Sequence, residues 1–271
     1  MTYYVPRGGH PGQEELTTDR AVFTEAYAVL PRGTMRDIVV SRWPHWRDTR
    51  GWILARPLTG FAETFSWYVV EVAAGGGSES PEPDPDAEAV LFVVDGTLRL
   101  SIGGIDHVLG AGGYAFLPPG TEWTATAGDT TTTFHWIRKA YERVDGIEVP
   151  EPFVTHESEV PLDPMPGTDG AWATQRFVDI DDVRHDMQVN IVTFEPGASI
   201  PFPETHVMEH GLYVLEGKGM YLLNADWVEV QAGDFMWLRA FCPQACYAGG
   251  PGRFRYLLYK DVHRHPRLRL A

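Results

Sequence analysis

The sequence predicts an all-β protein built from two similar barrels in tandem, and three observations carry this prediction. Short apolar runs bounded by Gly, Pro or Asp are frequent, whereas long stretches with a 3.6-residue period are scarce. Glycine and proline together make up 49 of the 271 residues (28 + 21), about 18% against a usual value of about 12%. One segment recurs later in the chain, so the same β-domain is encoded twice.

The apolar runs predict nine strands at a spacing of roughly 8–12 residues, which is typical of sandwiches and barrels. They are Val69–Val72, Ala89–Val94, Thr97–Ile102, Tyr114–Leu117, Met187–Phe194, Leu212–Leu215, Met220–Leu223, Phe235–Leu238 and Tyr256–Tyr259. The stretch Tyr141–Gly170 is rich in proline and acidic residues, so it is predicted to be a connector.

The repeat aligns Leu91–Gly96 (LFVVDG) with Leu212–Gly217 (LYVLEG), an offset of 121 (212 − 91). Without a gap, this frame pairs Gly76 with Gly197, Gly112 with Gly233, Phe116 with Trp237, Leu117 with Leu238 and Lys139 with Lys260. We therefore predict an N-terminal extension over residues 1–50 whose strands pack on the barrels, a first barrel over 51–145, a linker over 146–170 and a second barrel over 171–271.

Charge and composition exclude several classes of partner. The chain has 22 Lys and Arg against 37 Asp and Glu, a net charge of −15, which argues against binding to nucleic acid or to an anionic membrane surface. The longest apolar run, Ala89–Val94, is far shorter than the roughly 20 residues of a membrane span. The N-terminus lacks the apolar core of a signal peptide, and two cysteines make no disulfide framework. We expect a cytoplasmic protein.

Each copy carries two glycine-bounded motifs, in which one glycine opens a loop, a second closes a hairpin, and a third opens a return strand. The motifs are Gly76 to Gly96 and Gly112 to Gly120 in the first copy, and Gly197 to Gly217 and Gly233 to Leu238 in the second. This pattern resembles the cupin family, and specifically the bicupins. The resemblance implies two double-stranded β-helix (jelly-roll) barrels in tandem.

The cupin resemblance also implies a metal site on facing strands inside a barrel. In the second copy the ligand positions hold Glu204, His206, His210 and Gln244. The residues support this set independently, since Glu204, His206 and His210 share even parity and an extended chain points them to one side. Two imidazoles, one carboxylate and one amide oxygen, with no sulfur, suit a divalent ion such as Mn²⁺.

The first copy serves as an internal control for this metal site. Subtracting 121 from each ligand number gives Pro83, Pro85, Ala89 and Trp123. None of these side chains binds a metal, so we predict one Mn²⁺ per chain, in the second barrel, with the first barrel structural.

Other interpretations of these residues exist. A Glu and a His two residues apart also fit a solvated strand face. His206-Val-Met-Glu209-His210 matches the pattern of inverted zinc proteases, but that chemistry needs a helix and the following residues predict a strand. Cys242 and Cys246 are too few for a structural zinc, which favours buried packing thiols.

Within the cupins, the second copy resembles the ureidoglycine aminohydrolase group. The residues that carry this resemblance are Glu204–Gly217, Asp226-Trp227, Gln231–Asp234, Pro243-Gln244 and Arg255–Val262. The resemblance implies a Mn²⁺ enzyme of purine (allantoin) degradation that hydrolyses (S)-ureidoglycine to (S)-ureidoglycolate and ammonia. It also implies a homo-oligomer with a small-molecule substrate.

The same resemblance maps the polar residues of the catalytic pocket to Tyr221, Tyr256 and Lys260. We hypothesise that Lys260 moves protons, since a divalent cation nearby favours the neutral amine, and that the two tyrosines orient substrate and water. Barrel packing is the alternative for the tyrosines. For Lys260 it is a scaffold role, because Lys139 stands at the matching place in the metal-free copy.

Two further functions remain open from the sequence. One is a bicupin dioxygenase that uses Fe(II) on the same scaffold. The other is a non-enzymatic bicupin for storage or ligand sensing, although a retained four-ligand set argues against it. The basic tail that begins at Lys260 fits either a subunit contact or a solvated end.

Overall fold

The computed structural model describes residues 20–34 and 41–266. Parts of the predicted N-terminal extension, 1–19 and 35–40, and the end of the basic tail, 267–271, therefore lie outside the described residues. Regular structure in the described part is almost all strand, with short 3-10 helices at η1 (Arg32–Thr34) and η3 (Glu157–Glu159). The all-β prediction is confirmed. No helix in this part is long and apolar enough to cross a membrane.

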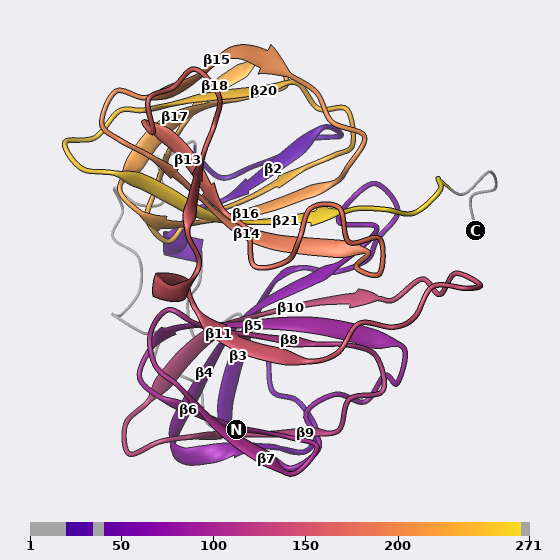
Figure 1. Cartoon of the computed structure of the whole chain (residues 1–271). Coiled ribbons are helices and arrows are strands. Elements are labelled where there is room, and N and C mark those ends of the chain that lie inside the picture. The colour runs from indigo at the N-terminus through magenta and orange to yellow at the C-terminus, as the bar shows by residue number, and fades with distance from the viewer. Residues whose placement is uncertain (1–19, 35–40, 267–271) are drawn as a thin grey trace.

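The first barrel is one strongly curled nine-stranded sheet, the lower body in Figure 1. Its strands are β3 (Trp46–Ala55), β4 (Ser66–Ser78), β5 (Ala87–Asp95), β6 (Leu98–Ile102), β7 (Ile105–Leu109), β8 (Gly113–Leu117), β9 (Trp123–Ala127), β10 (Thr132–Ala140) and β11 (Phe153–His156). The long strand β4 closes the barrel, because one part of it pairs with β10 and its far end pairs with β9.

The second barrel, the upper body in Figure 1, consists of an eight-stranded sheet and a four-stranded sheet. Ten of its twelve described strands follow the first barrel in the chain, and the other two, β1 (Val22–Phe23) and β2 (Tyr27–Leu30), come from the N-terminal residues. The ten are β12 (Leu162–Pro164), β13 (Trp172–Gln175), β14 (Met187–Phe194), β15 (Ser199–Glu204), β16 (His210–Glu216), β17 (Lys218–Leu223), β18 (Asp226–Gln231), β19 (Phe235–Leu238), β20 (Gln244–Ala248) and β21 (Phe254–Asp261). The two sheets enclose an apolar interior to which Val192, Leu212, Tyr221 and Tyr256 contribute.

The two tandem barrels predicted from the repeat are thus confirmed. All nine predicted strands coincide with observed strands, apart from Thr97, which lies just before β6. The proline-rich connector carries two short strands of its own: β11 pairs with β8 of the first barrel and β12 with β13 of the second.

The N-terminal residues add strands to the second barrel. The strands β1 (Val22–Phe23) and β2 (Tyr27–Leu30) form a hairpin, and β2 pairs with β19. The indigo strand β2 accordingly lies in the upper barrel in Figure 1, beside orange and yellow strands from the other end of the chain. β3, by contrast, pairs with β4 in the first barrel.

The barrels pack face to face through a shared apolar core. This core includes Trp67, Phe92 and Tyr114 from the first barrel and Phe235 and Tyr259 from the second. Each aromatic side chain buried there contributes about 1.5–3 kcal/mol through the hydrophobic effect. Because β16 and β21 of the second barrel lie against this core, the first barrel supports the wall of the second.

The repeat is visible in the backbone conformation as well as in the amino-acid sequence. Gly96 and Gly217 close equivalent hairpins with φ of 77° and 75°, a conformation that favours glycine. A Cβ at Gly217 would lie 2.0 Å from the carbonyl oxygen of Arg253. Any other residue would therefore clash with the backbone there, which explains the glycine in both copies.

Strand register corrects one detail of the repeat. In the second barrel His210 pairs with Lys260, and in the first barrel Ala89, the counterpart of His210, pairs with Arg138. The counterpart of Lys260 is therefore Arg138, an offset of 122 (260 − 138), and the alignment with Lys139 was wrong. The extra residue lies in the loop before the last strand, residues 249–253 against 128–131.

Candidate active site

The predicted ligand residues Glu204, His206 and His210 lie at one end of the second barrel. Glu204 is the last residue of β15 and His210 is the first residue of β16. The loop between these strands carries His206, whose Nε2 lies 3.2 Å from Oε1 of Glu204. The rings of His206 and His210 are 5.2 Å apart, centroid to centroid. All three side chains are thus neighbours. Shared parity is not the reason, because residues 205–209 lie outside the strands and the chain passes from the four-stranded sheet to the eight-stranded sheet between Glu204 and His210.

The His210 imidazole is buried and neutral, with its proton on one defined ring nitrogen. The residue is 4% exposed, and burial, together with the nearby charges of His206 and Lys260, lowers its pKa to about 3. Its Nδ1 lies 3.0 Å from the carbonyl oxygen of Glu209; since a carbonyl only accepts, Nδ1 carries the proton. The lone pair is then on Nε2, and a tautomer fixed in this way is typical of metal-binding histidines.

Gln244 lies beside Glu204 in the four-stranded sheet, whereas His210 belongs to the eight-stranded sheet. It opens β20, pairs with Glu204 across the β15–β20 ladder, and is buried. Its Oε1 accepts a hydrogen bond of 3.2 Å from the hydroxyl of Tyr221, which in turn lies 3.4 Å from the hydroxyl of Tyr256. Burial raises the pKa of both tyrosines well above the ordinary value, so both hydroxyls remain neutral donors.

One pair of donor atoms, from Glu204 and His206, has a separation that suits a divalent cation. Two ligand atoms at about 2.1–2.2 Å from an ion, in adjacent positions, are about 3.0–3.1 Å apart, and Glu204 Oε1 and His206 Nε2 are separated by 3.2 Å. Within residues 20–34 and 41–266, however, no group of three or more His, Cys, Asp or Glu side chains meets the spacing of a metal site. The four residues are therefore a candidate set.

Lys260 lies in the same cross-strand row as His210. It pairs with His210 on one side and with Gln188 on the other, so the three side chains point to one face of the sheet. Tyr256 and Leu258, at the same parity, belong to the barrel interior, so this face is the inside of the second barrel. Burial, with a smaller effect of the nearby Arg176, lowers the pKa of Lys260, which favours the neutral amine.

Comparison with known proteins gives the family. Residues 59–141 match the EutQ-like cupin domain and residues 190–259 match the cupin domain. The (S)-ureidoglycine aminohydrolase of Arabidopsis thaliana is 33% identical over 248 residues, 91% of this chain and 79% of that protein. The (S)-ureidoglycine aminohydrolase of Escherichia coli K12 is 31% identical over 258 residues, 93% of this chain and 95% of that protein.

The chain belongs to the (S)-ureidoglycine aminohydrolase family. A solved structure supports the fold of this family member: a protein of Pseudomonas aeruginosa is 64% identical to it, covers 100% of both chains and superposes with a TM-score of 0.92. The bicupin resemblance stated from the sequence is thereby confirmed.

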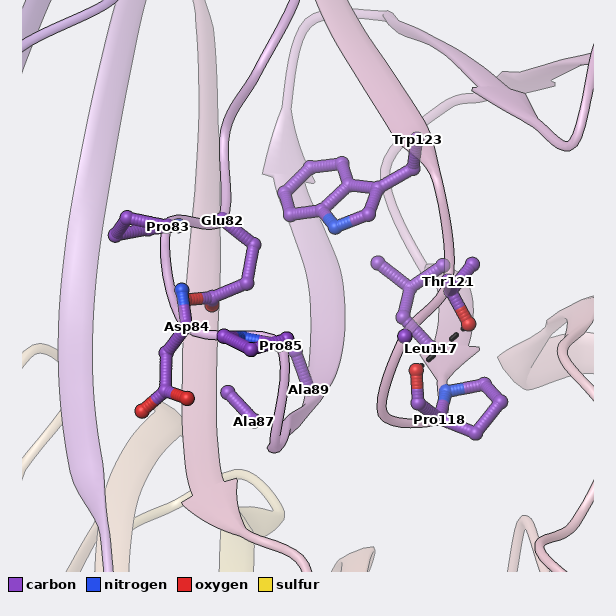
Figure 2. Close-up of a pocket in the computed structure, with 11 residues that line it drawn as sticks. Glu82, Pro83, Asp84, Pro85, Ala87, Ala89, Leu117, Pro118, Thr121 and Trp123 are labelled. Atoms are coloured by element: carbon purple, nitrogen blue, oxygen red, sulfur yellow. Dashed lines mark hydrogen bonds between the residues drawn. The ribbon is translucent and has the colours of Figure 1, made fainter.

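Figure 2 shows the first-barrel counterpart of the candidate site in this ureidoglycine aminohydrolase family member. Pro83, Pro85, Ala89 and Trp123 line a cavity of about 210 Å³. Strand register supports the equivalence for two of these residues. Ala89 pairs with Leu117 as His210 pairs with Leu238, and Trp123 pairs with Ile102 as Gln244 pairs with Leu223. The side chains drawn there supply no imidazole.

The first barrel also differs at the position of Lys260. Arg138 stands there, and its guanidinium donates to both carboxylate oxygens of Glu82 and, at 3.1 Å, to the hydroxyl of Tyr68. Lys139 instead forms a 2.6 Å salt bridge with Asp186, a residue of the segment before β14. The scaffold role inferred for Lys260 from Lys139 therefore loses its support, because the two lysines are not equivalent.

Two buried polar residues of the second barrel, Gln188 and Asn190, were not identified as candidate site residues from the sequence. Gln188 and Asn190 are each 1% exposed, and both polar atoms of Gln188 and Oδ1 of Asn190 have no hydrogen-bond partner within residues 20–34 and 41–266. They alternate with the inter-barrel core residues Val189 and Ile191, so they face the barrel interior. The alternation of polar and apolar residues in Met187–Phe194 was a signal that points to them.

Two further interpretations from the sequence, the inverted zinc protease and the packing thiols, are tested by the fold. His206 lies in the loop between β15 and β16, and His210 lies in a strand, which excludes the helix that an inverted zinc protease needs. Cys242 and Cys246 are free and buried, and burial raises the pKa of both thiols, that of Cys246 to about 12. The prediction of packing thiols is confirmed.

Proposed function

We propose that this chain hydrolyses (S)-ureidoglycine to (S)-ureidoglycolate and ammonia, with one Mn²⁺ held by Glu204, His206, His210 and Gln244. The observation that carries the proposal is the buried His210 with its tautomer fixed, next to the Glu204–His206 pair, in a member of this family. A cation bound there supplies charge stabilisation and holds the substrate in one orientation.

The reaction breaks the bond between the central carbon and its amine, forms a bond from that carbon to a water oxygen, and releases ammonia. Lys260 is the proposed proton carrier, taking a proton from the water or delivering one to the departing ammonia. Its lowered pKa suits both roles. The neutral hydroxyls of Tyr221 and Tyr256 are linked to Gln244 and orient substrate and water beside it.

Gln188 and Asn190 are the proposed partners of the ureido group. Leaving a buried polar group without a partner costs about 1–3 kcal/mol. Both polar atoms of Gln188 and Oδ1 of Asn190, on one face of β14, have no partner among the described residues and therefore need an explanation. The ureido group offers N–H donors and a carbonyl acceptor, which complement a side-chain amide. Gln188 is the cross-strand neighbour of Lys260. A ureido group bound to Gln188 would therefore place the reacting carbon close to Lys260.

Gln188→Met is expected to raise KM about three- to tenfold, the loss of a hydrogen bond worth about 0.5–1.5 kcal/mol, without lowering the melting temperature. Steady-state kinetics and calorimetry check this. Thr193→Val is the matched control and should leave KM unchanged. The Thr193 hydroxyl is also buried on β14 and has no partner in the described part of the chain, but it lies on the opposite face. A Gln188→Met protein that is destabilised with normal KM contradicts the assignment.

The test of the proposed activity is an anaerobic assay for ammonia, with chiral analysis of the product. Ureidoglycine is generated in situ from allantoate because it is unstable. We expect about one Mn²⁺ per chain in competent protein, ammonia release without oxygen, and (S)-ureidoglycolate. Oxygen consumption would instead favour the Fe(II) dioxygenase, and absence of any turnover a non-enzymatic bicupin.

Assembly and location stay predictions. A homo-oligomer is expected from the family resemblance and a cytoplasmic location from the composition. Light scattering of the purified protein checks the first and cell fractionation the second.

A further inference from the structure

Glu209, next to the candidate ligand His210, is held at its side chain by both barrels. It is buried, and its carboxylate accepts four hydrogen bonds. Two come from the backbone N–H groups of Glu63 and Thr64, each at 2.9 Å, one from the hydroxyl of Thr64 at 2.6 Å, and one from Nε1 of Trp237 at 2.6 Å. Carboxylate hydrogen bonds of this kind are the strong ones.

The backbone of Glu209 is held as well. Its carbonyl oxygen lies 3.0 Å from Nδ1 of His210, and its N–H donates to Oδ1 of Asp261 at 2.7 Å. The carbonyl that fixes the His210 tautomer is therefore attached to a residue whose side chain and N–H are both anchored. A shift of Glu209 has to move the acceptor that orients the imidazole.

Three of the four side-chain anchors come from the first barrel. Glu63 and Thr64 lie immediately before β4, roughly 145 residues away in the chain. The hydroxyl of Thr64 also lies 3.0 Å from that of Tyr259, on the last strand of the second barrel. The segment before β4 is thus fastened to the wall that carries His210 and Lys260.

We propose that Glu209 is a positioning residue through which the metal-free first barrel orients His210 for metal binding. The inference rests on the metal site proposed above. Partners that orient a ligating histidine typically contribute 10–100-fold to metal affinity. The first barrel then has a role in the reaction centre although it holds no metal ligand itself.

The competing explanation is that Glu209 only stabilises the contact between the two barrels. The repeat offers a matched control for this explanation. Glu88 is the counterpart of Glu209 (209 − 88 = 121) and is completely buried, beside Lys139 and Asp186. The residue after it is Ala89, which cannot ligate a metal. Replacing Glu88 therefore disturbs the inter-barrel contact without touching the His210 side chain.

The experiment measures Mn²⁺ affinity by electron paramagnetic resonance of free Mn²⁺, with melting temperature recorded alongside. Glu209→Ala should weaken binding 10–100-fold and Thr64→Val by a smaller factor. Glu209→Gln keeps an acceptor oxygen and should lie between wild type and Glu209→Ala. Glu88→Ala should bind Mn²⁺ like the wild type, even with a lower melting temperature.

A second readout uses the metal-free protein. Nitrogen-15 NMR should find the His210 proton on Nδ1 in the wild type and a mixture of tautomers in Glu209→Ala. Should Glu209→Ala not fold, Thr64→Val decides by the same two measurements.

Normal Mn²⁺ affinity in Glu209→Ala, or an equal loss in Glu88→Ala, overturns the positioning role and leaves the metal site standing. Failure of the wild-type protein itself to bind Mn²⁺ refutes the proposed metal site instead, so the two failures are distinguishable.

Discussion

Lys260→Met is expected to retain about one Mn²⁺ per chain and to lose turnover by about 10²–10⁴-fold, the usual contribution of a positioned proton-transfer group. Methionine keeps the length and packing of the side chain while removing the amine. The expected loss of turnover therefore reflects loss of proton transfer and not a change in packing. Metal analysis and steady-state rates of ammonia release check both halves of this expectation.

Lys260→Arg separates proton transfer from charge. Arginine keeps the positive charge but does not give up its proton in proteins, so this variant should be about as slow as Lys260→Met if Lys260 moves protons. Recovery of activity in the arginine variant would show that only the charge matters. Arg138→Met, at the equivalent position of the first barrel, is the control and should keep its rate once any loss of stability is allowed for.

The fold was predictable because its signals are local and repeated. Apolar runs between glycines and prolines mark strands, and Gly96 and Gly217 recur because both hairpins require positive φ. These inferences depend on residues close in sequence, which a single chain displays directly. Parity along one extended strand was the wrong reason for grouping Glu204 with His210, because the two residues belong to different strands in different sheets.

The features that could not be predicted from the sequence depend on contacts between residues far apart in the chain. The extra residue in the loop before β21 cannot be located by a gap-free alignment, and so Lys139 was matched to Lys260 when the strands pair Arg138 there. The hydrogen bonds of Glu209 to the segment before β4 join residues about 145 positions apart, and no sequence periodicity indicates them. The pairing of β2 with β19 is hidden for the same reason.

His210→Ala is expected to abolish stable Mn²⁺ binding and, with it, turnover. The variant removes the one imidazole in the candidate set that is both buried and fixed as a tautomer, and the remaining three side chains include only one nitrogen donor. Equilibrium dialysis followed by elemental analysis should find well under one Mn²⁺ per chain. His206→Ala, at a more exposed position, should lose metal with less effect on folding.

His135→Ala is the control that separates loss of a ligand from loss of a buried histidine. His135 is also fully buried, and burial likewise lowers its pKa to about 3. Its Nδ1 accepts a 3.0 Å hydrogen bond from Trp67, and its ring lies against Tyr213 in the contact between the barrels. Both alanine variants create a cavity and should lower the free energy of unfolding, but only His210→Ala should lose Mn²⁺. Equal metal loss in both would mean that general loosening of the barrels, and not coordination, explains the result.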